Sequence, residues 1–175
     1  MKPAKPYFLK SPRLGFRRWS EDDLPVALAL WGDPTVTRFT GGPFSPGQVA
    51  QRLKNEIASQ NENHFQYWPI FLLETDEHVG SAGMRAYKPA ERIYAMGFYL
   101  RPPLWGRGFA EEAGRAVIQY AFDSLGASAL FAGHHPENAA SKKILTKLGF
   151  QFTHKQLYPP TGLDHDSYLL MKRPA

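Results

Sequence analysis

The stretch L-W-G-R-G-F-A-E-E-A at residues 104–113 decides how the fold is interpreted. An apolar run at 93–100 precedes it and predicts a strand. Apolar or small residues follow it at positions 110, 113, 114, 117, 118 and 121, which is the spacing of an amphipathic helix. The order is therefore strand, glycine-bearing turn and helix. Because the N–H groups of a first helical turn have no partner inside the helix, this turn is a candidate site for an anion such as a pyrophosphate.

Two nucleotide-binding motifs that also place glycines before a helix are excluded. A dinucleotide fingerprint G-x-G-x-x-G would need glycine at the position of Glu111, and the Walker motif G-x-x-x-x-G-K-[ST] is absent. The simpler alternative, that Gly106 and Gly108 only form a tight turn, stays open on this evidence.

A second motif lies downstream, N-A-A-S-K-K-I-L-T-K-L-G-F at residues 138–150. Together with W-G-R-G-F-A-E-E-A at 105–113 it resembles the GNAT N-acetyltransferase superfamily, and within it the RimJ/RimL-like branch that acetylates protein N-termini. The stretch R-L-G-F-R-R-W at 13–19 is similar to the first strand of that family. Many relatives begin the turn with Gln or Arg, whereas this branch often has tryptophan, as here at Trp105. The resemblance covers roughly residues 13–172.

The order of predicted elements agrees with this resemblance. Strands are expected at 14–19, 67–74, 78–85, 93–100, 129–134, 151–158 and 167–172, and helices at 20–31, 45–60, 108–124 and 138–149. Loops are expected at 32–44 and 61–64. We therefore expect an α/β (α+β) GNAT fold, a mixed and mostly antiparallel sheet of about seven strands flanked by about four helices.

Most of the net positive charge lies at the N-terminus. The chain has 21 Lys and Arg against 16 Asp and Glu, and residues 1–13 hold four of these cations and no acid. Residues 1–12 are expected to form a basic tail before a single domain at 13–175. A solvated tail and a ribosome-contacting arm are both open interpretations.

Several classes of protein are excluded by composition. No apolar run approaches the roughly 20 residues of a membrane helix, and the N-terminus lacks the apolar core of a signal peptide, so a cytoplasmic protein is expected. With no cysteine in the chain, a cysteine-based zinc site and a cysteinyl intermediate are excluded. Direct attack on the acyl group is consistent with this, and no metal is expected.

The resemblance implies acetyl-CoA as cosubstrate. The turn would bind its pyrophosphate, and the strand before the turn would bind the pantetheine arm while one N–H polarises the acetyl carbonyl. Cofactor binding is thereby assigned to Phe98, Tyr99, Leu100, Trp105, Gly106, Arg107, Gly108, Phe109, Ala110, Asn138 and Ser141. Simpler roles stay open for several: Arg107 as a solvated cation, the strand aromatics as core, and Asn138 as a helix cap.

Candidates for proton transfer are fewer. Many relatives carry a tyrosine acid where this chain has Leu145, so the resemblance leaves Ser141 or an ordered water to protonate the leaving thiolate. His134 and His135, at the end of a predicted strand, are the first candidates for a base, although a lone histidine is often structural. Further candidates are Tyr99, His64, Glu91 and Glu137.

The sequence thus predicts an acetyl-CoA-dependent N-acetyltransferase acting on a primary amine, foremost a protein or peptide N-terminal α-amine of the ribosomal-protein type. A site without a dedicated base favours this acceptor, because deprotonating a lysine near neutral pH costs about 4 kcal/mol and an α-amine under about 1 kcal/mol.

Two alternatives stay open: a small-molecule acceptor such as a polyamine, amino acid or antibiotic, decided by loops 32–47 and 154–166, and a non-catalytic acyl-CoA-binding module. The expected partners are acetyl-CoA and the acceptor. Neither membrane nor nucleic acid is expected, contact with the ribosome is left open, and the chain is expected as a monomer or homodimer.

Overall fold

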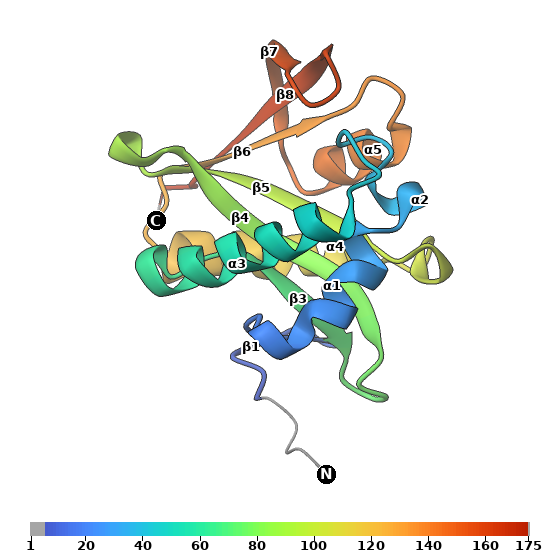
Figure 1. Ribbon diagram of the computed structural model, residues 1–175. Coiled ribbons are helices and arrows are strands. Elements are labelled where there is room, and N and C mark those ends of the chain that lie inside the picture. The colour runs from blue at the N-terminus through green and yellow to red at the C-terminus, as the bar shows by residue number, and fades with distance from the viewer. Residues whose placement is uncertain (1–5, 175) are drawn as a thin grey trace.

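One twisted sheet organises the structure, a computed structural model that describes residues 6–174 (Figure 1). Within those residues the sheet has eight strands in the order β1-β2-β3-β4-β5-β6-β8-β7. Neighbours are antiparallel except β5 and β6, which are parallel. The strands are β1 Leu9–Lys10, β2 Leu14–Phe16, β3 Tyr67–Leu72, β4 His78–Lys88, β5 Ile93–Leu100, β6 Ala129–His134, β7 Gln151–Tyr158 and β8 Leu163–Met171. The expected mixed, mostly antiparallel sheet is confirmed, with one strand more than expected.

Helices cover both faces of this sheet. They are α1 Leu24–Trp31, α2 Pro34–Thr37, α3 Pro46–Asn63, α4 Phe109–Asp123 and α5 Ala139–Lys147. Figure 1 shows α1 and α3 in front of the sheet and α4 behind it. The larger core lies on the α4 side and a smaller one lies under α1 and α3. In α3 the expected capping box is present, with Ser45 and Gln48 exchanging hydrogen bonds.

Three predicted boundaries on the N-terminal side are wrong. The segment at 34–37 is a short helix instead of a loop, because Pro34 starts it and the Asp33 side chain accepts from the Thr35 N–H. Helix α3 runs to Asn63 and ends on His64 in the left-handed conformation. The first predicted strand ends at Phe16, because the Trp19 N–H donates to the Gln66 side chain instead of a strand.

The final strand is also longer than predicted. It begins at Leu163 instead of residue 167, because pairing with β7 resumes directly across the turn, with Tyr158 opposite Leu163. The turn itself lies where expected, at residues 159–162, and Gly162 has a φ of +68°.

Part of the expected N-terminal tail belongs to the fold. Leu9–Lys10 forms β1 and pairs with β2. The Phe8 ring packs 5.3 Å from Trp68 and 5.8 Å from Tyr120, measured between ring centroids. Residues 1–5 lie outside the described residues. A two-residue strand has no periodicity, so the sequence pattern did not indicate it.

The pairing of β5 with β6 is interrupted. Their register contains only three residue pairs, the last being Ala95 opposite Phe131. Beyond that point β5 stays paired with β4 as far as Leu100, and β6 with β8 as far as His134. The C-terminal halves of the two strands therefore separate within the sheet. Among the described helices, none is long and apolar enough to cross a membrane.

The close approach of β3 and β4 gives a test of the fold. A Cβ atom added at Gly83 would lie 1.9 Å from the Gln66 carbonyl oxygen. Because backbone cannot give way as a side chain can, Gly83→Ala should lower the free energy of unfolding by about 1–3 kcal/mol. At Gly47 in α3 the nearest atom is 3.9 Å away, so Gly47→Ala should stabilise by about 0.5–1 kcal/mol. Denaturant unfolding measures both, and equal stability of Gly83→Ala and wild type would contradict the register.

Candidate functional site

The glycine-bearing turn between β5 and α4 has the backbone that an anion site requires. Gly106 and Gly108 have φ values of +73° and +82°, a region that residues with a Cβ rarely adopt. Gly108 caps α4 without any side-chain cap. Within residues 6–174, no acceptor is present for the backbone N–H groups at 106–111. These donors converge on the positive end of the helix dipole.

Side chains from distant parts of the chain fix this turn. Arg13, just before β2, binds Glu112 through its backbone N–H at 2.7 Å and through Nε at 2.6 Å. The Arg13 Nη1 also donates to the Arg107 carbonyl at 3.0 Å. At the other side, Trp105 Nε1 donates to the Leu100 carbonyl at 2.8 Å. The turn is therefore held in shape independently of any ligand.

A groove of about 460 Å³, here called the outer groove, runs from this turn along α5. It is lined by Thr35, Val36, Arg38, Phe39, Phe98, Tyr99, Leu100, Leu104, Trp105, Gly106, Gly108, Phe109, Ala110, Glu111, Asn138, Ala140, Ser141, Lys143, Ile144 and Lys147. Its three cations are Arg38, Lys143 and Lys147, and its one acid, Glu111, is paired with Arg115 and Lys147. The groove thus suits a long ligand with an anionic end. Arg107 lies beside the turn, 5.3 Å from the Phe109 ring.

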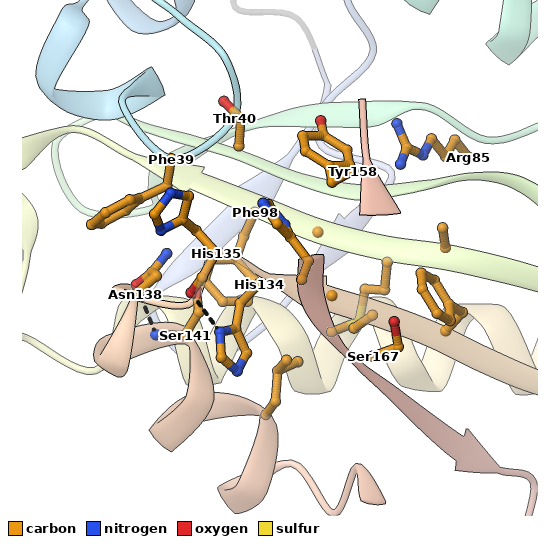
Figure 2. A pocket seen from close by; sticks show the side chains of 18 of the residues that line it. Phe39, Thr40, Arg85, Phe98, His134, His135, Asn138, Ser141, Tyr158 and Ser167 are labelled. Carbon is orange, nitrogen blue, oxygen red and sulfur yellow. Dashed lines mark hydrogen bonds between the residues drawn. The ribbon is translucent and has the colours of Figure 1, made fainter. Parts of the chain in front are cut away.

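A second cavity of about 220 Å³, the inner cavity, lies where β5 and β6 separate (Figure 2). Small residues of β5, Ala95 and Gly97, lie on its sheet side, and the β7–β8 hairpin contributes Gln156, Leu157, Tyr158 and His165. The inner cavity and the outer groove share six residues, here called the junction: Val36, Phe39, Phe98, Tyr99, Asn138 and Ser141. A ligand in one space can therefore reach a ligand in the other.

Two polar residues of α5 lie at the junction. Asn138 caps the helix, its Oδ1 accepting from the Ser141 N–H at 3.1 Å. The Ser141 hydroxyl has no hydrogen-bond partner among the described residues. Leu145, one turn later, is buried in the core. The capping role of Asn138 is confirmed, and the free hydroxyl of Ser141 remains available to a ligand.

The strand residues at the junction divide between core and site. Phe98 and Leu100 pack against the larger core. Tyr99 packs with the smaller core, and its hydroxyl accepts from Arg52 Nη1 at 3.5 Å. The backbone edge of this segment also faces the opening, because β6 no longer pairs with it.

The two histidines at the end of β6 are engaged through their ring nitrogens. His134 Nδ1 lies 2.8 Å from the His135 carbonyl, so it carries the proton, and Nε2 accepts from the Tyr168 hydroxyl at 3.1 Å. His135 Nδ1 accepts from the Glu137 N–H at 3.1 Å, so the proton of its neutral ring is on Nε2. In these tautomers neither residue offers a free lone pair.

His165 on β8 is a residue that the sequence analysis missed. Its Nε2 lies 2.9 Å from the Thr161 hydroxyl oxygen, which itself donates to the Tyr158 carbonyl. Neutral His165 therefore keeps an Nδ1 lone pair without a partner among residues 6–174. Burial, followed by the nearby His135 and His134, lowers the pKa of His165 below its usual 6.5. No motif surrounds this histidine, so only the hairpin register places it in the cavity.

Of the weaker candidates for a base, Tyr99 lies at the junction and the others lie away from it. His64 ends α3, Glu91 lies in the β4–β5 connection, and neither lines the two spaces described above. The side chain of Glu137 is 82% exposed. Among the described residues, no cluster of histidine and acidic side chains is arranged to hold a metal ion.

A third space, here called the arginine pocket, adjoins the inner cavity beneath α3. Arg52 lies 4.2 Å from the Trp31 ring and pairs with Glu56, Nε to Oε1 3.6 Å. Glu56 also accepts from the Tyr67 N–H at 2.7 Å. Arg85 of β4 lines both this pocket and the inner cavity. The i,i+4 spacing of Arg52 and Glu56 is visible in the sequence, but it is equally typical of an exposed helix face.

Comparison with known proteins identifies the kind of domain. Residues 13–151 match the family described as Acetyltransferase (GNAT) domain. The chain is 32% identical over 148 residues to an uncharacterized N-acetyltransferase p20 of Bacillus licheniformis, covering 82% of each.

Solved structures share the fold. A GNAT-family acetyltransferase from Bacillus anthracis has a TM-score of 0.81 at 20% identity, covering 93% of this chain and 97% of that one. RimL, a ribosomal L7/L12 α-N-protein acetyltransferase in complex with coenzyme A, has a TM-score of 0.79 at 16% identity, covering 92% and 95%.

The hydrogen bonds around the three histidines predict distinct tautomers. At neutral pH His134 should carry its proton on Nδ1, and His135 and His165 should carry theirs on Nε2. His165 should titrate below 6.5, and His135→Gln should raise that pKa. Because the unfolded chain takes up this proton at a higher pH than the folded chain, stability should fall as the pH decreases below about 6.5.

Long-range nitrogen–proton NMR correlations across a pH titration measure these tautomers directly. A Thr161→Val variant serves as control, since it removes the acceptor for His165 Nε2–H together with the hydroxyl's own bond to the Tyr158 carbonyl. A wild-type His165 with its proton on Nδ1, or titrating at or above 6.5, would contradict the arrangement.

Proposed function

This chain belongs to the family of GNAT acetyltransferase domains, which makes it an N-acetyltransferase, and we propose that it acetylates the α-amine of a protein or peptide N-terminus using acetyl-CoA. The observation that carries the proposal is the junction, where the outer groove meets the inner cavity. Donor and acceptor would enter from opposite sides and meet beside Ser141.

The outer groove fits coenzyme A. The unpaired N–H groups at 106–111 and the cations Arg107, Lys143 and Lys147 suit its phosphates. A Cβ added at Gly106 would meet nothing within 4 Å, so the turn is open to a ligand. The unpaired edge of β5 beyond Ala95 suits the amides of a pantetheine arm, which would add hydrogen bonds like those of a strand. When bound, acetyl-CoA supplies an acetyl group activated as a thioester.

Two side chains are placed to move protons. The Ser141 hydroxyl, free at the junction, would donate a proton to the departing sulfur and regain one from water. The Nδ1 lone pair of His165 would take the proton that the attacking amine loses, directly or through water. The lowered pKa of His165 keeps this lone pair available at neutral pH. Asn138 would keep its capping role and thereby position Ser141.

The choice of an α-amine rests on resemblance and on energetics. The paired motifs at 105–113 and 138–150 resemble the RimJ/RimL-like branch, and RimL is described as an α-N-protein acetyltransferase. Because His165 is a weaker base than an ordinary histidine, it favours an amine that is easily deprotonated. An α-amine costs under about 1 kcal/mol to deprotonate near neutral pH and a lysine about 4 kcal/mol.

The phosphate turn is tested by a change at Gly108. Gly108→Val puts a β-branched side chain at a φ of +82°, where it strains the turn and blocks the N–H groups. Acetyl-CoA should then no longer raise the melting temperature, as measured by thermal shift. Gly126, at a φ of +65° outside both spaces, gives the matched control. Gly126→Val should lose about 1–2 kcal/mol of stability but keep the full acetyl-CoA effect. Equal cofactor effects in the two variants would refute the turn as phosphate site.

The acceptor is tested by release of free CoA thiol against an amine panel at neutral pH. Peptides with a free α-amine should exceed N-terminally blocked lysine peptides in kcat/KM by about 100-fold or more. Polyamines, whose amines have higher pKa values, should also be poor acceptors.

Variants at two histidines complete this test. His165→Gln should lower kcat for every acceptor used by about 100-fold, while His64→Asn, at the exposed end of α3, should leave it unchanged. Efficient use of a polyamine with no activity on any peptide would overturn the α-amine proposal. A His165→Gln enzyme with normal kcat would remove His165 from the mechanism.

A further inference from the structure

The inner cavity has an unusual charge distribution. Its lining contains one permanent cation, Arg85, and no aspartate or glutamate. In the adjoining arginine pocket the one acid is Glu56, and both of its oxygens are engaged, one with Arg52 and the other with the Tyr67 N–H. A cationic acceptor would thus meet a positive charge and no free carboxylate.

Arg85 forms no ion pair with a carboxylate among the described residues. Its electrostatic neighbours are the phenols of Tyr67, Tyr158 and Tyr99, the cation Arg52, and at longer range the carboxylate of Glu56, which is already paired with Arg52. Its side chain remains exposed toward the cavity. An arginine guanidinium offers a fork of five donors that matches a carboxylate in two parallel hydrogen bonds. The Tyr158 hydroxyl lies within hydrogen-bonding reach of this group.

The sheet leaves room for an acceptor between Arg85 and the junction. Arg85 lies opposite Ala95, and Ala95 lies opposite Phe131, so the three share a row across β4, β5 and β6. The central position of that row has only a methyl group. Figure 2 shows Arg85 and Tyr158 on one side of the cavity and Asn138 and Ser141 on the other. The distance along a strand from Ala95 to Tyr99 is roughly 13 Å. The long side chain of Arg85 spans part of this distance.

The far wall of this space is fixed. Tyr87, on the same face of β4 as Arg85, stacks on Phe131 with ring centroids 4.1 Å apart and planes 7° apart. Its hydroxyl donates to Gln156 on β7 at 3.3 Å. The hairpin is thereby tied to the sheet beside Arg85, and an acceptor reaching this end lies against aromatic side chains.

We propose that the acceptor carries a carboxylate a few bonds from its amine and that Arg85 binds this carboxylate. The inference rests on the proposed function, since it takes the junction as the place of transfer. Two sources share this chemistry: a peptide with an acidic second residue, and a small amino acid. Placing the amine at the junction and the carboxylate at Arg85 orients the nucleophile, which is worth more in rate than in affinity alone.

The test compares acceptors that differ only in charge. The peptide arm uses the amidated peptides Ser-Glu-Ala, Ser-Gln-Ala and Ser-Lys-Ala. The small-molecule arm uses γ-aminobutyrate, its amide and putrescine. In the arm that contains the true acceptor, the carboxylate compound should exceed its amide in kcat/KM by about 10-fold or more, and the cationic compound should be poorest. The arm that shows this order identifies the source.

Variants assign the effect to Arg85. Arg85→Gln should make the carboxylate and amide acceptors equal while leaving the rate with the amide within about threefold of wild type. Arg85→Lys should restore part of the preference, and Arg85→Glu should invert it in favour of the cationic compound. Arg92→Gln, an exposed arginine in the β4–β5 connection, should change nothing. Circular dichroism and melting temperature confirm that each variant is folded.

Failure of this inference is separate from failure of the proposed function. If wild type shows no preference for the carboxylate in either arm, or if Arg85→Gln keeps the preference, the role of Arg85 is overturned while acetylation of α-amines can stand. If all peptides fail but γ-aminobutyrate exceeds its amide in an Arg85-dependent way, the α-amine proposal falls and the role of Arg85 stands.

Discussion

The separation of β5 from β6 beyond Ala95 and Phe131 leaves two strand edges without a neighbour in the middle of the sheet. Buried backbone groups without partners cost about 1–3 kcal/mol each, so the opening persists only because other elements hold the strands apart. Helix α5 occupies part of the space, and it can approach α4 closely because Gly114 has no side chain: a Cβ there would lie 2.6 Å from Leu148 Cδ1. The same two helices flank the outer groove. Packing that opens the sheet therefore also builds the groove.

The two sides of the opening differ chemically. The outer groove depends on backbone donors and exposed cations, which suit a diffusing polyanion and lose strength with added salt. The inner cavity is lined by aromatic rings, three histidines and a single arginine, and its polar groups are mostly engaged with one another. On the proposed function, affinity for the donor and selectivity for the acceptor would be carried by separate residues. Changes in the β7–β8 hairpin would then alter acceptor choice without disturbing the turn at 104–108.

Local features were predictable from the sequence, and features set by strand register were not. The turn at 104–108, strand β6 at Ala129–His134 and the cap Asn138 follow from neighbouring residues, and the structure has them where expected. His134 and His135 are candidates from the sequence because they end a predicted strand. The partner of His134 Nε2, Tyr168, lies on another strand and cannot be identified from neighbouring residues, whereas Glu137, the partner of His135, is two residues away.

The roles of His165 and Arg85 are not predictable from the sequence for the same reason. Each lies in the inner cavity only because of its strand partner, Gln156 for His165 and Ala95 for Arg85. Neither pairing leaves a mark in the local sequence. Sequence patterns therefore predicted the elements that line the outer groove and left the inner cavity undefined, because the first is built largely from contiguous motifs and the second from strands that meet through long-range pairing.

Arg13 forms hydrogen bonds with Glu112 and with the Arg107 carbonyl. These bonds connect the turn at 104–108 to a residue about a hundred positions earlier in the chain. During synthesis the edge formed by β1 and β2 leaves the ribosome long before α4 is made. Arg13 therefore has no partner until Glu112 of α4 has been synthesised. The outer groove takes its final form only when Arg13 and its partners on the turn and on α4 are all present. On the proposed function, a nascent chain would acquire its site for a nucleotide-bearing thioester only after most of its sheet has been made, and damage to the N-terminal edge would alter the turn.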